Sequence, residues 1–230
     1  MSKSRLWVIG LASLLVVGQF ILFRALIASG DLPDPIAIHW GFSGQPDGFS
    51  DANAYLLGIT VLYLVMLFLL SYFGFVLGRR LLQPLLFGLT AVMFSFLFLL
   101  FSLTILIQVG NSAEQAILSP WMILAIIALP IGLAGFGLRK PTVELGRELV
   151  VKLGSIPALR LSMARITGAE EVELRAVDYG GLGIRYAKQT LAFIPSSGPG
   201  VLVRTNFGES VAIRTDQPKE LVAKITKGRS

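Results

Sequence analysis

The only histidine of the chain, His39, lies in a polar connection between two long apolar segments. The same connection holds the acidic residues Asp31, Asp34, Asp47 and Asp51. Imidazole and carboxylate groups bind divalent cations, so these residue types would allow a metal site. None of their spacings matches a zinc or calcium loop, however. We therefore expect no bound metal, a histidine that hydrogen-bonds a turn, and aspartates that start turns or cap a helix.

Two serines near the histidine, Ser43 and Ser50, raise the alternative of a hydrolase. The sequence has no nucleophile elbow and no oxyanion motif, which argues against this chemistry. Cysteine is absent, and this excludes disulfides, thiolate metal sites and a cysteine nucleophile. We expect a protein that is not an enzyme and needs no cofactor. A metal-dependent membrane enzyme using His39 is the third of the three hypotheses given below.

The composition places these residues in a membrane protein. Of the 230 residues, 54% are hydrophobic and 15% are charged, and the mean hydropathy is +0.73. In soluble domains about 25% of residues are charged. Segments long and apolar enough to cross a bilayer as helices, which takes about 20 residues, are residues 6–28, 55–78, 81–109 and 117–138. We expect four transmembrane helices. The first is a retained anchor, because its apolar run is too long for a signal peptide and no small-residue cleavage site follows.

Basic residues flank the predicted spans on one side only. They precede the first span, join the second to the third, and follow the fourth: Lys3, Arg5, Arg79, Arg80, Arg139 and Lys140. The intervening connections, residues 29–53 and 110–116, contain no Lys or Arg. Lys and Arg that flank a span are kept on the cytoplasmic side. We therefore expect both termini in the cytoplasm and the loop 29–53 outside the cell.

Within the predicted spans few groups could move an ion or a proton. Arg24 alone lies inside a span, close enough to its outer end to reach the interface and pair with Asp31 or Asp34. Pro130 predicts a kink in the fourth span. Glycines in the second and fourth spans allow close approach of helices, either within one chain or in a homo-oligomer.

The charge balance changes after the last span. Residues 1–138 hold five basic and five acidic residues, whereas residues 139–230 hold fifteen and nine, so the formal net charge of +6 belongs to the C-terminal part. We expect a transmembrane domain of residues 1–140 and a separate cytoplasmic domain of residues 141–230. Its basic surface would lie near anionic lipid headgroups, and we favour a solvated basic surface over specific lipid recognition.

Short runs with alternating or β-branched residues predict that this domain is made of strands. They cover residues 158–166, 171–177, 182–187, 190–194, 201–205 and 210–215. Residues 206–208 have the types of a hairpin turn. A final helix follows, with Asp216 as a cap, Pro218 in its first turn and an apolar stripe over residues 221–225.

The phrases "LSMARITGAEEVEL", "YGGLGIRY", "SGPGVLVRTNFGESVAI" and "TDQPKELVAKI" follow these elements in order. Together they resemble the bacterial pleckstrin-homology-like domains that are attached to membrane spans, over residues 144–227. The resemblance implies a curled antiparallel β-barrel with one C-terminal helix, used for binding or assembly. It implies no ligand residues here.

The loop that contains His39 has its own pattern. As an extended segment it would place large apolar side chains on one face: Ile36, Ile38, Trp40 and Phe42. Trp40 is of the type that anchors at headgroup depth. Residues 44–48 (GQPDG) predict a turn in which Gly48 takes positive φ. Ser50 or Asp51 can cap the second span.

The stretch "LPDPIAIHWGFSGQPDGFSD" resembles the N-terminal domain of unknown function of SdpI-type immunity proteins. The shared positions are Leu32, Pro33, Pro35, His39, Trp40, Gly44, Asp47 and Gly48. The SdpI type continues with further spans of its own, whereas here two spans and a β domain follow. We take His39, Trp40, Asp47 and Gly48 as candidate binding residues of the extracellular loop.

Three functions from different classes are consistent with these patterns. The first is a non-enzymatic module for sensing, immunity or signalling in the bacterial cell membrane. Its loop would meet a peptide or envelope ligand, and its cytoplasmic domain would bind a protein partner. The second is a structural assembly factor of a membrane complex, in which the loop only joins two helices. The third is the metal-dependent enzyme. In each case the lipid bilayer surrounds the spans and no nucleic acid is bound.

Overall fold

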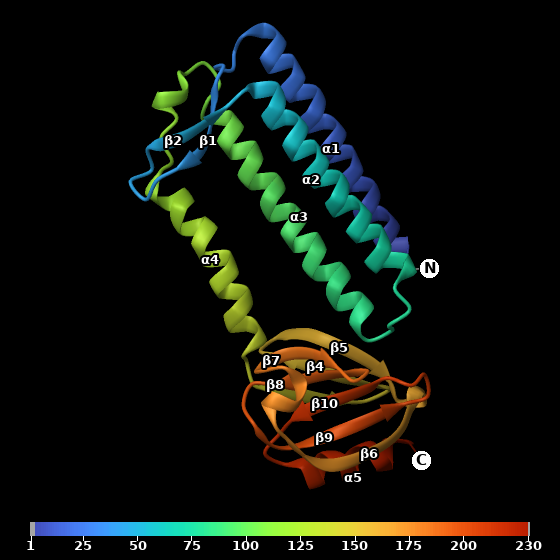
Figure 1. Ribbon diagram of the computed structural model, residues 1–230. Coiled ribbons are helices and arrows are strands. Elements are labelled where there is room, and N and C mark those ends of the chain that lie inside the picture. The colour runs from blue at the N-terminus through green and yellow to red at the C-terminus, as the bar shows by residue number, and fades with distance from the viewer. Residues whose placement is uncertain (1–2, 230) are drawn as a thin grey trace. The chain divides into compact units, whose positions relative to one another are not determined.

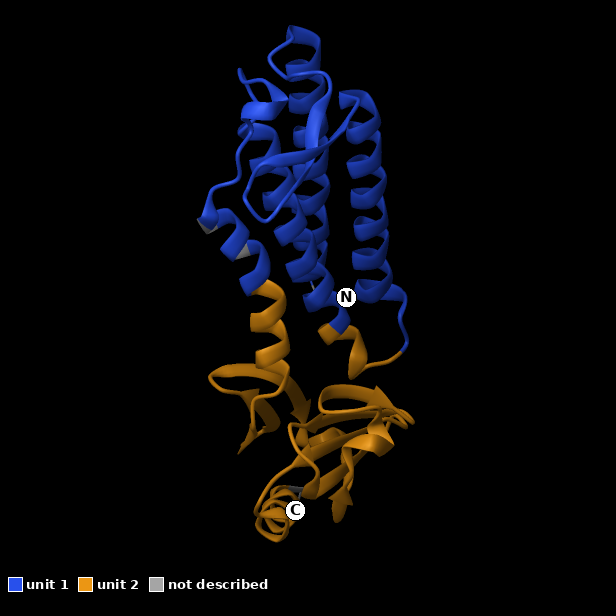
Figure 2. Ribbon diagram, turned by 60° about the vertical axis from the view of Figure 1, so that its left-hand side comes forward, with its two compact units in different colours: residues 1–78, 86–128 blue, residues 79–85, 129–230 orange. Residues whose placement is uncertain are grey.

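The computed structural model describes residues 3–229, and the chain divides into two compact units (Figures 1 and 2). Unit 1 comprises residues 1–78 and 86–128, and unit 2 comprises residues 79–85 and 129–230. The predicted boundary at residue 140 lies later in the chain than this division. Residues 79–85, which are the end of the connection before α3 and the first turn of that helix, are grouped with the C-terminal strands.

Long helices make up most of unit 1: α1 (Lys3–Ser29), α2 (Ala52–Ser71), which continues into a π-helical turn (Tyr72–Val76), and α3 (Leu82–Leu106). Among the described residues, three helical segments are long and apolar enough to cross a membrane, and they correspond to the first three predicted spans. The fourth predicted span corresponds to α4 (Pro120–Gly137), a shorter apolar helix with Pro130 inside it. A membrane crossing by α4 stays a prediction.

Aliphatic and aromatic side chains together form the interior of unit 1, and the aromatic ones gather around Tyr63. Tyr63 of α2 is only 1% exposed, and its ring lies within about 6 Å of the rings of Phe94, Phe98 and Phe101 on α3. Large apolar side chains elsewhere on the same helices are exposed, with Leu14 at 71%. Exposed apolar surface on this scale would be unfavourable in water, which supports a bilayer environment for these helices.

Arg24 does not pair with the aspartates predicted from the sequence. Its Nη1 donates a hydrogen bond to Oδ1 of Asn53 at 2.6 Å. Asp31 instead accepts a hydrogen bond from the Ser29 hydroxyl at 2.6 Å, and Asp34 accepts one from the Ala52 N–H at 3.4 Å. The physical reason is the packing of α1 against α2, which places the start of α2 next to the last turns of α1.

Strands and one helix form most of unit 2. The strands are β3 (Pro141–Leu145), β4 (Glu148–Leu153), β5 (Ile156–Ser162), β6 (Ile166–Leu174), β7 (Gly183–Ala187), β8 (Thr190–Ile194), β9 (Gly198–Thr205) and β10 (Ser210–Arg214), and the helix is α5 (Pro218–Arg229). Each of the six predicted runs overlaps a strand and the final helix is confirmed, although residues 163–165 and 176–177 are helical turns, and β3 and β4 are additional. The predicted hairpin is confirmed as β9–β10, with Val203 opposite Val211 and Gly208 at φ +82° in the turn.

The predicted antiparallel barrel is wrong in two respects. The strands form a three-stranded sheet, β3-β4-β5, and a five-stranded sheet, β6-β9-β10-β8-β7, and those described do not close into a barrel. In addition β8 and β10 pair in parallel, because β10 inserts between β8 and β9. Parallel strands are usually covered on both faces. This holds for β8, where Leu191 and Phe193 contact the main core and Ala192 and Ile194 contact a second cluster on the other face.

The buried carboxylate of Glu209, 4% exposed, binds residues 79–85 to these sheets. It accepts a hydrogen bond from the Leu81 N–H at 3.1 Å and another from the Tyr186 hydroxyl at 2.5 Å. Burial and the neighbouring Glu209 raise the pKa of Tyr186 to about 12, so the phenol stays a donor at neutral pH. The Leu81 side chain is 2% exposed and belongs to the main core of unit 2. The β sheets therefore have a core residue that precedes them in the chain by about sixty positions.

We predict that Leu81→Ala destabilises unit 2. Removing a buried leucine side chain costs about 2–5 kcal/mol, because it leaves a cavity. Hydrogen exchange of the full chain in detergent should become faster in the peptides that cover β8 and β10. Leu89→Ala, on α3 where the side chain is 48% exposed, is the matched control and should leave these peptides unchanged. Equal exchange in the two variants would contradict a core role for Leu81.

Candidate functional site

The loop predicted to lie outside the cell folds as a β-hairpin. Strands β1 (Ile36–Trp40) and β2 (Pro46–Ser50) pair antiparallel, with irregular register on both sides of His39. The turn occupies residues 41–45, where Gly44 has φ +80° and donates its N–H to the Gly41 carbonyl at 2.9 Å. Asp51 caps α2 as predicted, since its Oδ1 accepts the Ala54 N–H at 2.8 Å.

The position of this turn corrects the sequence interpretation. Pro46, Asp47 and Gly48 lie on β2 and not in the turn, and the glycine with positive φ is Gly44. Gly48 has a different role. It lies opposite His39, and a Cβ atom added to Gly48 would stand 2.9 Å from the His39 Cβ. A glycine is therefore required here by the close approach of the two strands.

The predicted single apolar face of the loop is also wrong. Ile36 and Ala37 are adjacent and both buried, at 1% and 0% exposure, whereas Ile38 is 40% exposed. Phe42, in the turn, is fully exposed. The irregular register around His39 breaks the two-residue alternation on which the prediction rested.

The buried amide side chain of Gln108, just after the end of α3, holds the hairpin in place. Gln108 is 1% exposed, and its Oε1 accepts the Ala37 N–H at 2.7 Å. Its Nε2 donates to the carbonyls of Ala37 at 3.1 Å and of Thr104 at 2.7 Å. The side chain thus satisfies both backbone groups of Ala37, as a neighbouring strand would. Gln108 was not among the predicted site residues, although an uncharged polar residue at the end of an apolar segment was a usable signal.

The connection that follows Gln108 covers the other side of the hairpin. The indole N–H of Trp40 donates to the Ala116 carbonyl at 2.5 Å, and the Leu118 N–H donates to the Gly44 carbonyl at 3.0 Å. Trp40, Ala37, Ala113 and Ala116 form one apolar cluster. Trp40 is therefore an anchor within the protein. A role at headgroup depth, as predicted from its residue type, is not tested by this contact.

His39 and Asp47 point away from these anchors. Nδ1 of His39 is bonded to Oδ1 of Asp47, and the two side chains are 72% and 53% exposed. Exposed ion pairs of this kind contribute about 0–1 kcal/mol to stability. Ile38, Phe42 and Phe49 are exposed on the same hairpin. The pair and these apolar side chains offer an imidazole, a carboxylate and hydrophobic contacts to a ligand.

The remaining acidic and hydroxyl residues of the loop do not join this pair. Asp31, Asp34 and Asp51 accept the hydrogen bonds described above, and within residues 3–229 no group of three or more His, Asp and Glu side chains could hold a metal ion. The Ser50 hydroxyl donates to the Asp51 carbonyl at 3.3 Å, and the Ser43 hydroxyl accepts the Gln45 N–H at 3.4 Å. Of the four candidate residues, the structure places His39, Asp47 and Gly48 together and uses Trp40 as an anchor.

The hairpin lies in the part of the chain that comparison with known proteins recognises. Residues 14–69 match the family model described as Domain of unknown function (DUF1648). The match begins in α1, includes the whole hairpin and ends near the end of α2. No curated protein and no solved structure matches the chain. The long apolar helices and this match define a membrane protein that carries a DUF1648 domain, followed by a part rich in β-sheet.

We predict that Gln108→Ala loosens the hairpin. The change leaves a buried N–H and a buried C=O of Ala37 without partners, and each unpaired group costs about 1–3 kcal/mol. Hydrogen exchange over residues 36–50 should become faster, and the melting temperature should fall. Gln45→Ala, which truncates an exposed amide of the same hairpin, should change neither quantity. A Gln108→Ala protein with native exchange over these residues would rule out the anchor.

Two glycines with similar backbone conformation allow the strain of positive φ to be distinguished from a steric clash between the hairpin turn and Leu118. Gly44 and Gly30 have similar positive φ, +80° and +77°. A Cβ on Gly44 would stand 2.5 Å from the Leu118 carbonyl oxygen, whereas a Cβ on Gly30 would meet nothing within 4 Å. Gly30→Ala should therefore cost only the strain, of order 1 kcal/mol, and Gly44→Ala distinctly more. Thermal melting of the two variants measures the difference, and equal melting temperatures would show that Leu118 does not restrict the turn.

Proposed function

We propose that this protein is a non-enzymatic receptor or immunity module of the bacterial cell membrane. Its hairpin binds a peptide or envelope component outside the cell, and its β-rich part binds a protein partner in the cytoplasm. The orientation is supported by the basic residues at one side of the spans and by their absence from residues 29–53 and 110–116. The resemblance of the hairpin sequence to SdpI-type immunity proteins supports the same assignment.

The observation that carries the proposal is the contrast between the two sides of the hairpin. Ala37 and Trp40 are held by Gln108 and Ala116, so the backbone is fixed before any ligand arrives. His39 and Asp47 are exposed and contribute little to stability. A rigid backbone that presents exposed polar and aromatic side chains loses little conformational entropy on binding. This arrangement suits recognition better than it suits catalysis.

A structural assembly factor is the second candidate. The same hydrogen bonds favour it, because Gln108 and Ala116 tie the hairpin to the segment that follows α3. These bonds would hold the helices of unit 1 together without any contribution from His39. The resemblance to pleckstrin-homology-like domains, which implies binding or assembly, fits both candidates. A receptor needs the exposed side chains of His39 and Asp47 to bind its ligand, whereas an assembly factor does not.

A photo-crosslinking residue in place of the fully exposed Phe42 distinguishes them in living cells. Under our proposal this residue forms a discrete crosslinked product, and the double variant His39→Ala, Asp47→Asn loses it at unchanged protein amount and melting temperature. Gln45→Ala with Glu114→Gln, which removes one exposed amide and one exposed carboxylate from the two connections, should retain the product. An unchanged product in the His39 and Asp47 variant would favour the assembly factor.

A further inference from the structure

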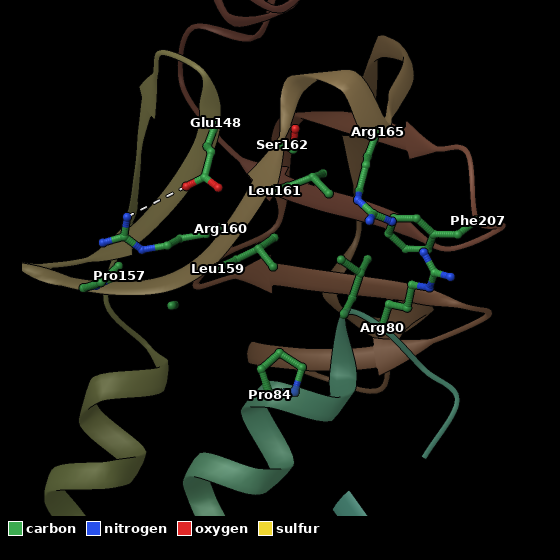
Figure 3. A pocket seen from close by; sticks show the side chains of 12 residues that line it. Arg80, Pro84, Glu148, Pro157, Leu159, Arg160, Leu161, Ser162, Arg165 and Phe207 are labelled. Atoms are coloured by element: carbon green, nitrogen blue, oxygen red, sulfur yellow. Dashed lines mark ion pairs between the residues drawn. The ribbon is translucent and has the colours of Figure 1, made fainter. Parts of the chain in front are cut away.

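Unit 2 contains an open pocket of about 720 Å³ that the hairpin proposal does not involve (Figure 3). Four parts of the chain line it: the start of α3 with the residues before it, the first residue of β4, strand β5 with the short helix that follows, and the turn between β9 and β10. All of them belong to unit 2. The volume is within the range of about 300–1,000 Å³ typical of sites for small ligands.

Two arginines share one aromatic ring at this pocket. The guanidinium carbons of Arg80 and Arg165 lie 5.4 Å and 6.0 Å from the centre of the Phe207 ring (Figure 3). The Asn206 N–H donates to the Arg165 carbonyl at 2.9 Å, and this bond ties the backbone next to Phe207 to the residue that bears one of the two guanidinium groups. Stacking on an aromatic face orients a guanidinium group and leaves its N–H donors free at the edge. The pocket thus presents two oriented, fully charged donor groups.

The charge at the pocket is unbalanced. Its lining includes Arg80, Arg160 and Arg165 and a single acid, Glu148, so the formal sum is +2. Glu148 lies 3.9 Å from Arg160, with both side chains largely exposed. Within residues 3–229 no carboxylate forms an ion pair with Arg80 or Arg165. An anion with several acceptor oxygens, such as a phosphate group, matches the fork of donors on each arginine.

Apart from Ser162, the rest of the lining is apolar. Leu159 and Leu161 of β5 and Pro84 of α3 contribute carbon surface next to the arginines. Arg80 follows the apolar segment Ala52–Val76 by four residues and precedes α3 by two. Both helices are long enough to span a bilayer, and a residue between two such helices is expected close to the headgroup layer. A ligand with a phosphate and an apolar portion is available at that depth.

The sequence alone favoured a solvated basic surface, but these two arginines at one ring favour a specific site. We infer that this pocket binds the phosphate of an anionic membrane lipid, with Arg80 and Arg165 as its donors and Phe207 as the ring that orients them. The inference does not depend on which side of the membrane unit 2 occupies. It is also independent of any ligand at the hairpin, since the residues involved belong to different units.

Native mass spectrometry of the full chain in detergent tests the assignment, with phosphatidylglycerol and phosphatidylcholine as the probes. The protein should retain phosphatidylglycerol in preference to phosphatidylcholine. Arg80→Gln with Arg165→Gln should reduce that preference about tenfold, which corresponds to about 1.4 kcal/mol. Arg175→Gln with Arg185→Gln removes the same charge from exposed positions of unit 2 outside the pocket and should preserve the preference.

Two further arms keep the result interpretable. Phe207→Leu retains both charges and removes the ring, so it should weaken phosphatidylglycerol retention by a smaller factor, and circular dichroism and melting should show that each variant is folded. Inorganic phosphate at millimolar concentration should compete only weakly. Full displacement by inorganic phosphate, equal retention of the two lipids, or an unaltered preference in a folded Arg80→Gln, Arg165→Gln protein would each overturn the assignment.

Discussion

The candidate site depends on one buried amide. A two-stranded hairpin is at best marginally stable by itself, because its outer edges leave backbone donors and acceptors without partners. In this protein Gln108 supplies those partners to Ala37 from the end of an apolar helical segment, at 2.7 Å and 3.1 Å. The hydrogen bonds of Trp40 and Gly44 to the following connection then become local additions to an already placed strand. The exposed position of His39 and Asp47 is a consequence of that anchoring.

In unit 2 a carboxylate side chain pairs with a buried backbone group in a similar way. The Leu81 N–H is buried beside an apolar core, and the Glu209 carboxylate accepts it together with the Tyr186 hydroxyl. In both units, then, a polar side chain pairs with a backbone group from a distant part of the chain. The surrounding hydrophobic contacts supply most of the stabilisation, and these few hydrogen bonds determine which segments come together.

Local patterns were sufficient to predict most of the elements, although β2, β3 and β4 were missed, and long-range pairing was not predictable. The apolar segments, the six strands, the β9–β10 turn and the cap at Asp51 follow from periodicity and from residue types that act within a few positions. Gln108 bonds Ala37 across 71 positions, and Glu209 bonds Leu81 across 128. A polar residue at the end of an apolar segment can be noticed in the sequence, as Gln108 could have been, but the sequence has no local signal for the distant residue with which it pairs. The same limit explains the parallel β8–β10 pair and the true role of Gly48, which depend on what lies opposite each residue and not on its neighbours in the chain.

The hydrogen bond between Leu81 and Glu209 can form only late in translation, because its two partners are far apart in the chain. The chain emerges from the ribosome N-terminal end first, so the connection between α2 and α3 is complete long before its partner exists. Until Glu209 is translated, Leu81 has neither its hydrogen-bond acceptor nor the core that covers its side chain. A messenger truncated after the codons of α3 and before that of Glu209 would therefore yield a protein that contains the first three helices but whose Leu81 lacks both its hydrogen-bond acceptor and the core that covers its side chain.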